Sequence, residues 1–353
     1  MTVTNSSSKR VIAFATGGSN RATFRRTVIS CSVLFGALFI VIVLTALIGS
    51  EQLPVRASLC ALLSLGKGQC GLSGEQFDIL FQIRLPRILL AAAVGGSLAT
   101  AGASYQALLR NPLAEPYLLG ISNGAAVGTM VALVFFGANE WSRPLLAFAG
   151  ALLATFTVYR LARGSAGATP ERLILAGVIV TTFLSSVIVF VTTLMDATRI
   201  RSFTFWLLGD LSGSSRALLP IAITIALAGS VALTANARSL NLLMLGERDA
   251  FDLGVEVGRV RIIVFLVASL LVGSSVAASG SVGYVGLVVP HLVRLSLGSD
   301  NRISIPAATL GGALFVIVAD TVARTIIAPR ELPVGAITAL IGAPLFIYLL
   351  KRA

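Results

Sequence analysis

Long uninterrupted runs of apolar residues alternate with short polar segments along this chain of 353 residues. Four runs, 88–109, 116–139, 173–195 and 217–237, contain no charged residue over 21 to 24 positions each. A helix of about 20 apolar residues crosses the roughly 30 Å hydrocarbon core of a bilayer. The pattern therefore predicts an all-α, polytopic membrane protein.

The same pattern, followed along the whole chain, predicts about ten membrane helices. We expect them near 27–49, 88–109, 117–138, 144–159, 173–195, 217–235, 262–280, 284–299, 303–322 and 332–350. The first run follows a basic stretch, but it exceeds the 7–15 apolar residues of a secretion signal, so we interpret it as an uncleaved helix. Residues 1–26 are then an N-terminal tail and 27–353 a single transmembrane domain.

The basic residues predict the orientation of this bundle. An even number of helices puts both termini on one side, and with the termini in the cytoplasm the inner segments hold 17 of the 27 Lys and Arg residues. Short cytoplasmic loops carry such an excess in membrane proteins. We therefore expect both termini to be cytoplasmic.

Composition excludes several classes of protein. Charged residues make up 12% of the chain, against roughly 25% in soluble domains, which argues against a soluble enzyme. The net charge of +12 is compatible with nucleic-acid binding, but the basic residues are scattered singly between apolar runs. Lipid headgroups explain that scatter better, and we expect no nucleic-acid partner.

A weak internal repeat accompanies the predicted helices. Residues 91–102 and 269–280 align without gaps and match at five of twelve positions. They lie five helices apart, so the two copies would have opposite orientations, as in the inverted repeats of transporters. Shared Gly, Ala and Ser content is the alternative explanation.

The residues needed for catalysis or metal binding are missing from the pattern. The sequence has no GxxxxGK[ST] phosphate loop, a single histidine, His291, and three cysteines. We therefore predict no catalytic residues, no metal site and no cofactor bound by this chain. Asp196, Asp210 and Asp320 fall at outer helix ends, so a carboxylate relay for protons is disfavoured and energy for transport would come from a partner.

Hydroxyl groups are the main polar feature within the helices. At helical spacing, Thr181, Ser185 and Thr192 share one face of the run 173–195. They either hydrogen-bond to neighbouring helices and to their own carbonyls or line a wet pathway.

The inner loop 240–258 has the composition of a contact surface. Four acids, including Glu247, are interleaved with Leu245, Phe251 and Leu253 and punctuated by glycines. Two short helices along the membrane surface would satisfy this pattern. A solvated loop is the alternative, but it would expose Leu and Phe without a partner.

Other connections carry distinctive residues. On the outer side, Arg84 and Arg87 precede the second helix and Arg324 ends the ninth. All three could bind carboxylates of a docking protein. Alternatively, Arg84 and Arg87 are headgroup anchors and Arg324 is the i,i+4 partner of Asp320. Inside, two prolines in 110–117 predict a stiff elbow. Cys60 and Cys70 lie in an outer loop, either bonded to each other or as free thiols.

These segments together resemble a known family. The runs IRLPR (83–87), QALLRNPLAEPYLLGISNGA (106–125), ERLILAGV (171–178), LGERDAFDLG (245–254), GYVGLVVPHLVR (283–294), DTVAR (320–324) and ELPVGAITALIGAPLFIYLL (331–350) are similar to permease subunits of ABC importers for iron chelates such as siderophores, haem or cobalamin. The resemblance implies a type II importer permease of the bacterial inner membrane. It also implies a homodimer, two ATPase subunits that carry ATP and Mg inside, and a substrate-binding protein outside.

The resemblance assigns roles to particular residues. Arg84, Arg87 and Arg324 would dock the binding protein, and Asn111, Leu113, Pro170 and Glu171 would form inner gates beside a pathway that includes Thr181, Ser185 and Thr192. The residues that would couple to the ATPase are Leu245, Gly246, Glu247, Ala250, Phe251, Leu253 and Gly254. An ion-coupled secondary transporter without ATPase subunits is the alternative function. Side-chain types alone do not separate haem, siderophore and cobalamin as cargo.

Overall fold

The computed structural model describes residues 7–49, 51–64, 66–67, 70–136, 141–164, 167–212 and 217–352. Each of the ten predicted ranges overlaps one long helix. These helices are α1 (Ser7–Leu47), α4 (Leu85–Leu108), α5 (Ile121–Phe135), α6 (Ser142–Ala162), α7 (Pro170–Thr193), α9 (Leu218–Ala235), α12 (Val257–Ser279), α13 (Val285–Leu297), α14 (Asn301–Thr325) and α15 (Val334–Arg352).

Shorter elements fill the connections. The inner loop forms two short helices, as its pattern predicted, α10 (Ala237–Leu245) and α11 (Glu247–Asp252). Two strands that the pattern did not predict form a small hairpin before α7. The remaining short elements are α2 (Val55–Leu63), α3 (Gly74–Asp78), the π-helix η1 (Ile79–Arg84), the 3-10 helix η2 (Pro116–Leu119), β1 (Arg163–Gly164), β2 (Gly167–Ala168) and α8 (Ala197–Leu207).

Among the residues that the structure describes, six helices are long and apolar enough to cross a membrane. They are Thr23–Leu47 within α1, together with α6, α7, α9, α12 and α14, while α5, α13 and 334–348 of α15 are shorter apolar helices. The bundle is thus that of a membrane protein, and the count of ten crossings stays a prediction. Residues 1–6 of the expected tail lie outside the described residues, and from Ser7 onward that segment continues as α1.

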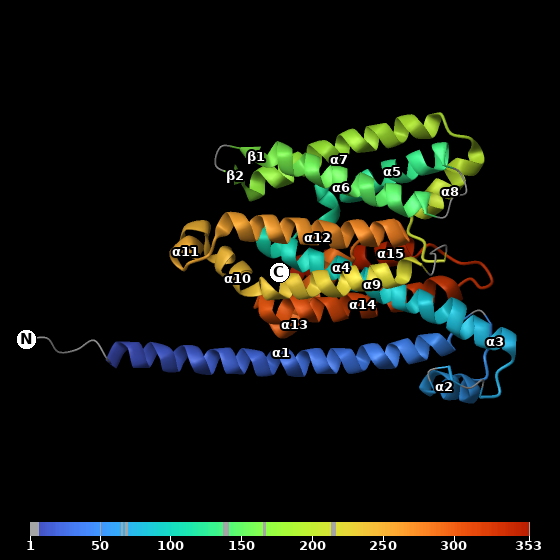
Figure 1. Cartoon of the computed structure of the whole chain (residues 1–353), viewed down its shortest axis with the longest axis horizontal. Coiled ribbons are helices and arrows are strands. Elements are labelled where there is room, and N and C mark those ends of the chain that lie inside the picture. The colour runs from blue at the N-terminus through green and yellow to red at the C-terminus, as the bar shows by residue number, and fades with distance from the viewer. Residues whose placement is uncertain are drawn as a thin grey trace, which may run out of the picture.

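Helix α4 runs through the middle of the bundle and packs against α14, α12, α9 and α13 (Figure 1). Its glycines allow very close contacts between backbones. A Cβ at Gly95 would lie 2.1 Å from the carbonyl oxygen of Gly312, and one at Gly102 would lie 2.0 Å from that of Gly286. Small residues therefore serve helix packing here, as expected in a bilayer, where no hydrophobic effect drives helices together. The two runs of the predicted repeat lie on α4 and α12, which are in contact.

Helix α7 lies at the edge of the molecule, on the side opposite α1 (Figure 1). Only 17% of the residues in its most apolar stretch are buried, and α7 packs mainly against α6, α5 and η2. A Cβ at Gly177 would lie 2.4 Å from the carbonyl oxygen of Leu118 in η2. The first two turns of α7 are therefore fixed against η2, while the side of α7 that faces away from the bundle remains largely uncovered.

Candidate functional site

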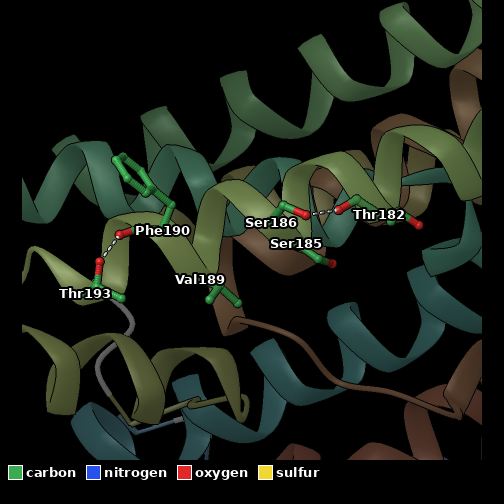
Figure 2. Close-up of a pocket in the computed structure, with 6 residues that line it drawn as sticks. All are labelled: Thr182, Ser185, Ser186, Val189, Phe190 and Thr193. Carbon is green, nitrogen blue, oxygen red and sulfur yellow. Dashed lines mark hydrogen bonds between the residues drawn. The ribbon is translucent and has the colours of Figure 1, made fainter.

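A hollow of about 560 Å³ lies along the exposed side of α7. Figure 2 shows its lining, in which two apolar side chains lie between hydroxyl side chains along the helix. The lining residues are Thr182, Ser185, Ser186, Val189, Phe190 and Thr193. Spacings of three and four residues place Thr182, Ser186, Val189 and Thr193 on one helical face.

The hollow contains one of the three hydroxyl residues that the sequence suggested. Ser185 lines it, whereas Thr181 lies against Gly120, and the hydroxyl of Thr192 donates to the Val189 carbonyl. Within the hollow, Thr182 and Ser186 each donate their hydroxyl proton to a carbonyl one turn back. This surface is uncharged, and its polar groups are hydroxyls, which can accept and donate hydrogen bonds.

Asn123 fastens α5 to the same stretch of α7. Its amide nitrogen donates to the Thr181 carbonyl over 3.1 Å and to the Ser185 hydroxyl over 2.7 Å. Sequence reasoning did not single out Asn123, although an amide in the apolar run ISNGA was an available signal. Together with the contact between Gly177 and η2, this amide joins α7, α5 and η2 into one unit.

The elbow between α4 and α5 is anchored at both ends. Arg110 opens it with a left-handed backbone (φ 49°), and the Asn111 side chain accepts a hydrogen bond from the Leu113 amide. Further along, the Tyr117 hydroxyl bonds to the backbone of Val282 over 2.9 and 3.0 Å. Leu113 itself is 46% exposed. The two proposed gate residues therefore sit on a tight turn whose far end is held by the segment before α13.

The second proposed gate segment forms the start of α7. Pro170 is buried in the first turn, and Glu171 is exposed beside it. The Thr169 side chain caps the helix by accepting from the Arg172 amide. Proline suits a first turn because its missing N–H would have no helical partner there.

Helix α11 and the residues that flank it present apolar side chains away from the bundle. Gly246, with φ 143°, makes the sharp turn between α10 and α11 that a side chain would disfavour. Ala250 is fully buried, whereas Leu245, Phe251 and Leu253 are 66%, 71% and 60% exposed. The turn after α11 ends on Gly254, again with positive φ (84°). Such an apolar cluster next to acidic residues is typical of a protein contact surface.

Glu247 is the charged contact of α11 with the bundle. Its carboxylate binds Arg261 of α12, which is 9% exposed, and lies 3.7 Å from the guanidinium of Arg110. The predicted coupling residues thus divide into an outward group and an inward pair, Glu247 and Ala250.

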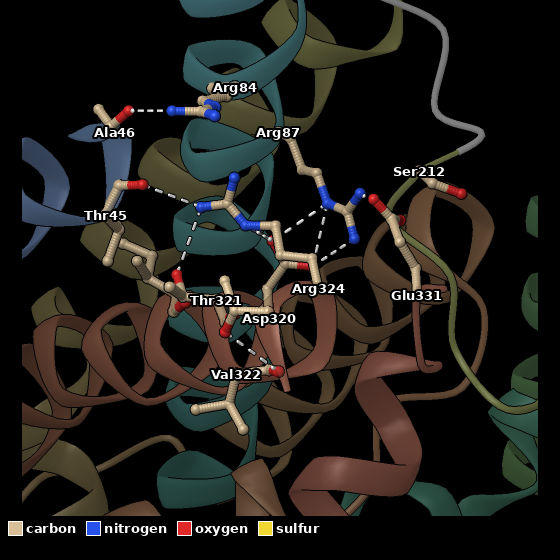
Figure 3. A network of polar contacts seen from close by, with 12 residues as sticks. Thr45, Ala46, Arg84, Arg87, Ser212, Asp320, Thr321, Val322, Arg324 and Glu331 are labelled. Carbon is tan, nitrogen blue, oxygen red and sulfur yellow. Dashed lines mark hydrogen bonds and ion pairs between the residues drawn. The ribbon is translucent and has the colours of Figure 1, made fainter. Parts of the chain in front are cut away.

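At the opposite end of the molecule, the three outer arginines lie together in different settings (Figure 3). Arg84 donates to the carbonyls of Ala46 and Glu51, and Arg324 donates to that of Thr45 over 3.0 Å. Both arginines are about 5% exposed or less, and they satisfy carbonyls at the end of α1. A helix leaves its last four carbonyls without intrahelical partners, and cations near them are stabilising.

Arg87 is bound by two carboxylates of the same chain. Asp320, which is 1% exposed, accepts from it at 2.9 to 3.1 Å, and the more exposed Glu331 accepts at 2.7 Å. Asp320 also lies 3.7 Å from Arg324, the i,i+4 contact considered above. The three arginines still border a hollow of about 230 Å³, whose other lining residues are Glu51, Ile79, Ile83 and Glu331.

Cys60 and Cys70 are bonded to each other. Their Cα atoms are 5.8 Å apart, within the usual range for a disulfide, and the bond ties α2 to the loop before α3. Of the two alternatives left open by the sequence, the structure has the disulfide. Figure 1 places α2 and α3 at the end of the molecule opposite α10 and α11.

Comparison with known proteins decides the family. The model of the FecCD transport family matches residues 21–352. This chain belongs to the FecCD transport family. The match covers α4 to α15 and most of α1, so the whole bundle described above is the family's domain.

Two members with known names are close in sequence. The cobalamin import system permease protein BtuC of Halobacterium salinarum is 44% identical over 273 residues, which is 77% of this chain and 73% of that protein. The hemin transport system permease protein HmuU of Yersinia pestis is 37% identical over 91% of this chain and 96% of that protein. The resemblance inferred from the sequence is therefore confirmed.

A solved structure shares the fold of this FecCD member. A metal-chelate type ABC transporter in an inward-facing conformation superposes with a TM-score of 0.77 at 33% identity, covering 91% of this chain and 99% of that one. The chain is accordingly a membrane permease with the all-helical fold of these transporters.

Proposed function

We propose that this chain is the permease subunit of an ATP-driven importer that carries a bulky metal chelate, namely an iron chelate, haem or cobalamin. The match of the FecCD transport model to residues 21–352 is the observation that carries the proposal. Relatives named for cobalamin and hemin transport support the class of cargo. The uncharged hollow along α7 suits a large ligand that is held weakly and released.

We infer three kinds of protein partner from the exposed surfaces. A second copy of the chain would cover the exposed side of α7, so that the two hollows face a shared pathway. Two ATPase subunits, which would carry ATP and Mg, would receive α11 through Leu245, Phe251 and Leu253, side chains that are at least 60% exposed. A substrate-binding protein would place carboxylates in the hollow bordered by Arg84, Arg87 and Arg324.

The proposed mechanism is alternating access driven from the cytoplasmic side. Closure of the ATPase pair on nucleotide moves α11, and that movement reorients the elbow and α7 around the cargo. Asn111 and Leu113 on the elbow, with Pro170 and Glu171 at the start of α7, form the inner gates. Thr181, Ser185 and Thr192, together with the other hydroxyls of α7, belong to the pathway wall.

The proposed location is the bacterial inner membrane with both termini in the cytoplasm. Placing α11 inside puts the basic N-terminus on the same side and the Cys60–Cys70 disulfide outside. Disulfides persist in the periplasm and outside the cell, so this orientation agrees with redox conditions.

The test of the function is an uptake comparison in proteoliposomes that contain the permease and its cognate ATPase, with the cognate binding protein outside. Haem, a ferric siderophore and cobalamin are supplied in parallel, with and without internal ATP. ATP-dependent accumulation of one of them is expected. Uptake that follows a proton or sodium gradient and ignores ATP would replace this function by that of a secondary transporter.

A further inference from the structure

We propose that a cluster of three charged residues, Glu247, Arg110 and Arg261, transmits the movement of α11 to both inner gates. The inference rests on the proposed function and names positioning residues within it. Glu247 belongs to α11, Arg261 to the following helix α12, and Arg110 to the elbow. The cluster therefore joins α11 and α12 to a segment that is distant in the sequence, at the end of the molecule where Figure 1 places α10, α11 and the β1–β2 hairpin.

Glu247 lies at the centre of this charge cluster. Its Oε1 atom binds Arg261 and is 3.7 Å from a guanidinium nitrogen of Arg110. Arg261 is anchored, since its side chain is 9% exposed, whereas Glu247 and Arg110 are 39% and 38% exposed and have room to move. Among the described residues, the ion pairs of Glu247 are those that connect α11 to the rest of the chain.

Arg110 brings the first gate into the cluster. It opens the elbow that carries Asn111 and Leu113, whose turn is closed by the hydrogen bond from the Leu113 amide to the Asn111 side chain. A shift of α11 changes the distance from Glu247 to Arg110 and with it the balance of forces on the elbow.

Movement of the elbow passes directly to the wall of the hollow. The contact between Gly177 and Leu118 and the hydrogen bonds of Asn123 fix α7 to η2 and α5, so these parts move as one. Partly exposed ion pairs contribute little to stability. The cluster is therefore suited to reporting the position of α11 and adds little to holding the fold together.

The test is a double-mutant cycle in the assembled transporter. Arg110→Gln, Glu247→Gln and the double variant are reconstituted with the ATPase and binding protein, and cargo taken up per ATP hydrolysed is measured. Arg110→Lys retains the charge, and Arg238→Gln is the control, since Arg238 is exposed on α10 and has no ion pair among the residues described.

We expect each single Gln variant to lower uptake per ATP by about threefold or more and the double variant to be no worse, because residues that act as a pair are not additive. Arg110→Lys should recover most of the loss, and Arg238→Gln should match the unmodified protein. Any of three results would overturn the inference. Uptake per ATP could be unchanged in the single variants, or the losses could multiply in the double variant. Arg110→Lys could also lose as much as Arg110→Gln. If a Gln variant fails to assemble, Glu247→Asp is measured in its place; its shorter side chain should also lower uptake per ATP, and an unchanged ratio would overturn the inference. Absence of ATP-dependent uptake in the unmodified assembly would instead refute the proposed function.

Discussion

Asp320 and Glu331 both bind Arg87, but from environments that predict very different effects on stability. The Asp320 carboxylate is 1% exposed, whereas the Glu331 side chain is 42% exposed. The isosteric substitutions Asp320→Asn and Glu331→Gln each remove one negative charge without changing the size of the side chain. They therefore compare a buried with an exposed partner of the same guanidinium.

The magnitudes follow from burial. Removing one partner of a buried ion pair costs about 3–5 kcal/mol, because the other charge is left without compensation. An asparagine at 320 still accepts one hydrogen bond from Arg87, so we expect the lower end, about 3 kcal/mol. An exposed pair is worth about 0–1 kcal/mol, and this is the range expected for Glu331→Gln.

The measurement is reversible unfolding in mixed micelles on titration with a denaturing detergent, followed by tryptophan fluorescence and circular dichroism. A loss for Asp320→Asn at least 2 kcal/mol larger than that for Glu331→Gln is expected from the ranges above. Equal effects of the two substitutions would refute the argument that burial decides the strength of these contacts.

Three further predictions concern packing, docking and pH. Gly95→Val should abolish a monodisperse peak in size-exclusion chromatography, because the added Cβ alone would lie 2.1 Å from the carbonyl oxygen of Gly312. The control Gly36→Val should leave that peak unchanged, because a Cβ at Gly36 has no neighbouring atom within 4 Å. Phe251→Ala should leave the unfolding curve unchanged, because the ring is 71% exposed, yet weaken co-purification of the ATPase about tenfold; undiminished co-purification would contradict the docking role. Burial opposes ionisation of Asp300, but hydrogen bonds from Arg302 and Asn241 outweigh it and hold the pKa of Asp300 below its usual range. The contribution of the ionised Asp300 carboxylate to stability is therefore complete above about pH 4, and it disappears as the pH falls through the lowered pKa. Asp300→Ala should thus lower the free energy of unfolding by about 1 kcal/mol at pH 7 and by progressively less as the solution is acidified. A loss of stability that does not change with pH would contradict this.

The helices were predictable because their signals are local. Long charge-free stretches mark most of the apolar runs, and the alternation of Leu, Phe and acids around Gly246 marks α10 and α11. Residue motifs spread from 83 to 350 indicated the family, which the match to the family model confirms.

What the sequence left undecided depends on contacts between distant segments. The orientation of α7 follows from Gly177 meeting Leu118, so the hollow is lined by Thr182 and Ser186 in place of Thr181 and Thr192. Likewise, no local pattern shows that Arg84 turns towards the carbonyls that end α1. Spacing predicts neighbours along one helix, while the partner across the bundle is set by tertiary packing.

The most direct test of the central claim, that a separate ATPase drives this permease through α11, is the initial rate of cargo uptake into proteoliposomes with and without that ATPase. With binding protein and ATP present in both, we predict rapid uptake by the full assembly and a rate at the level of empty liposomes for the permease alone. Equal rates in the two preparations would contradict the account.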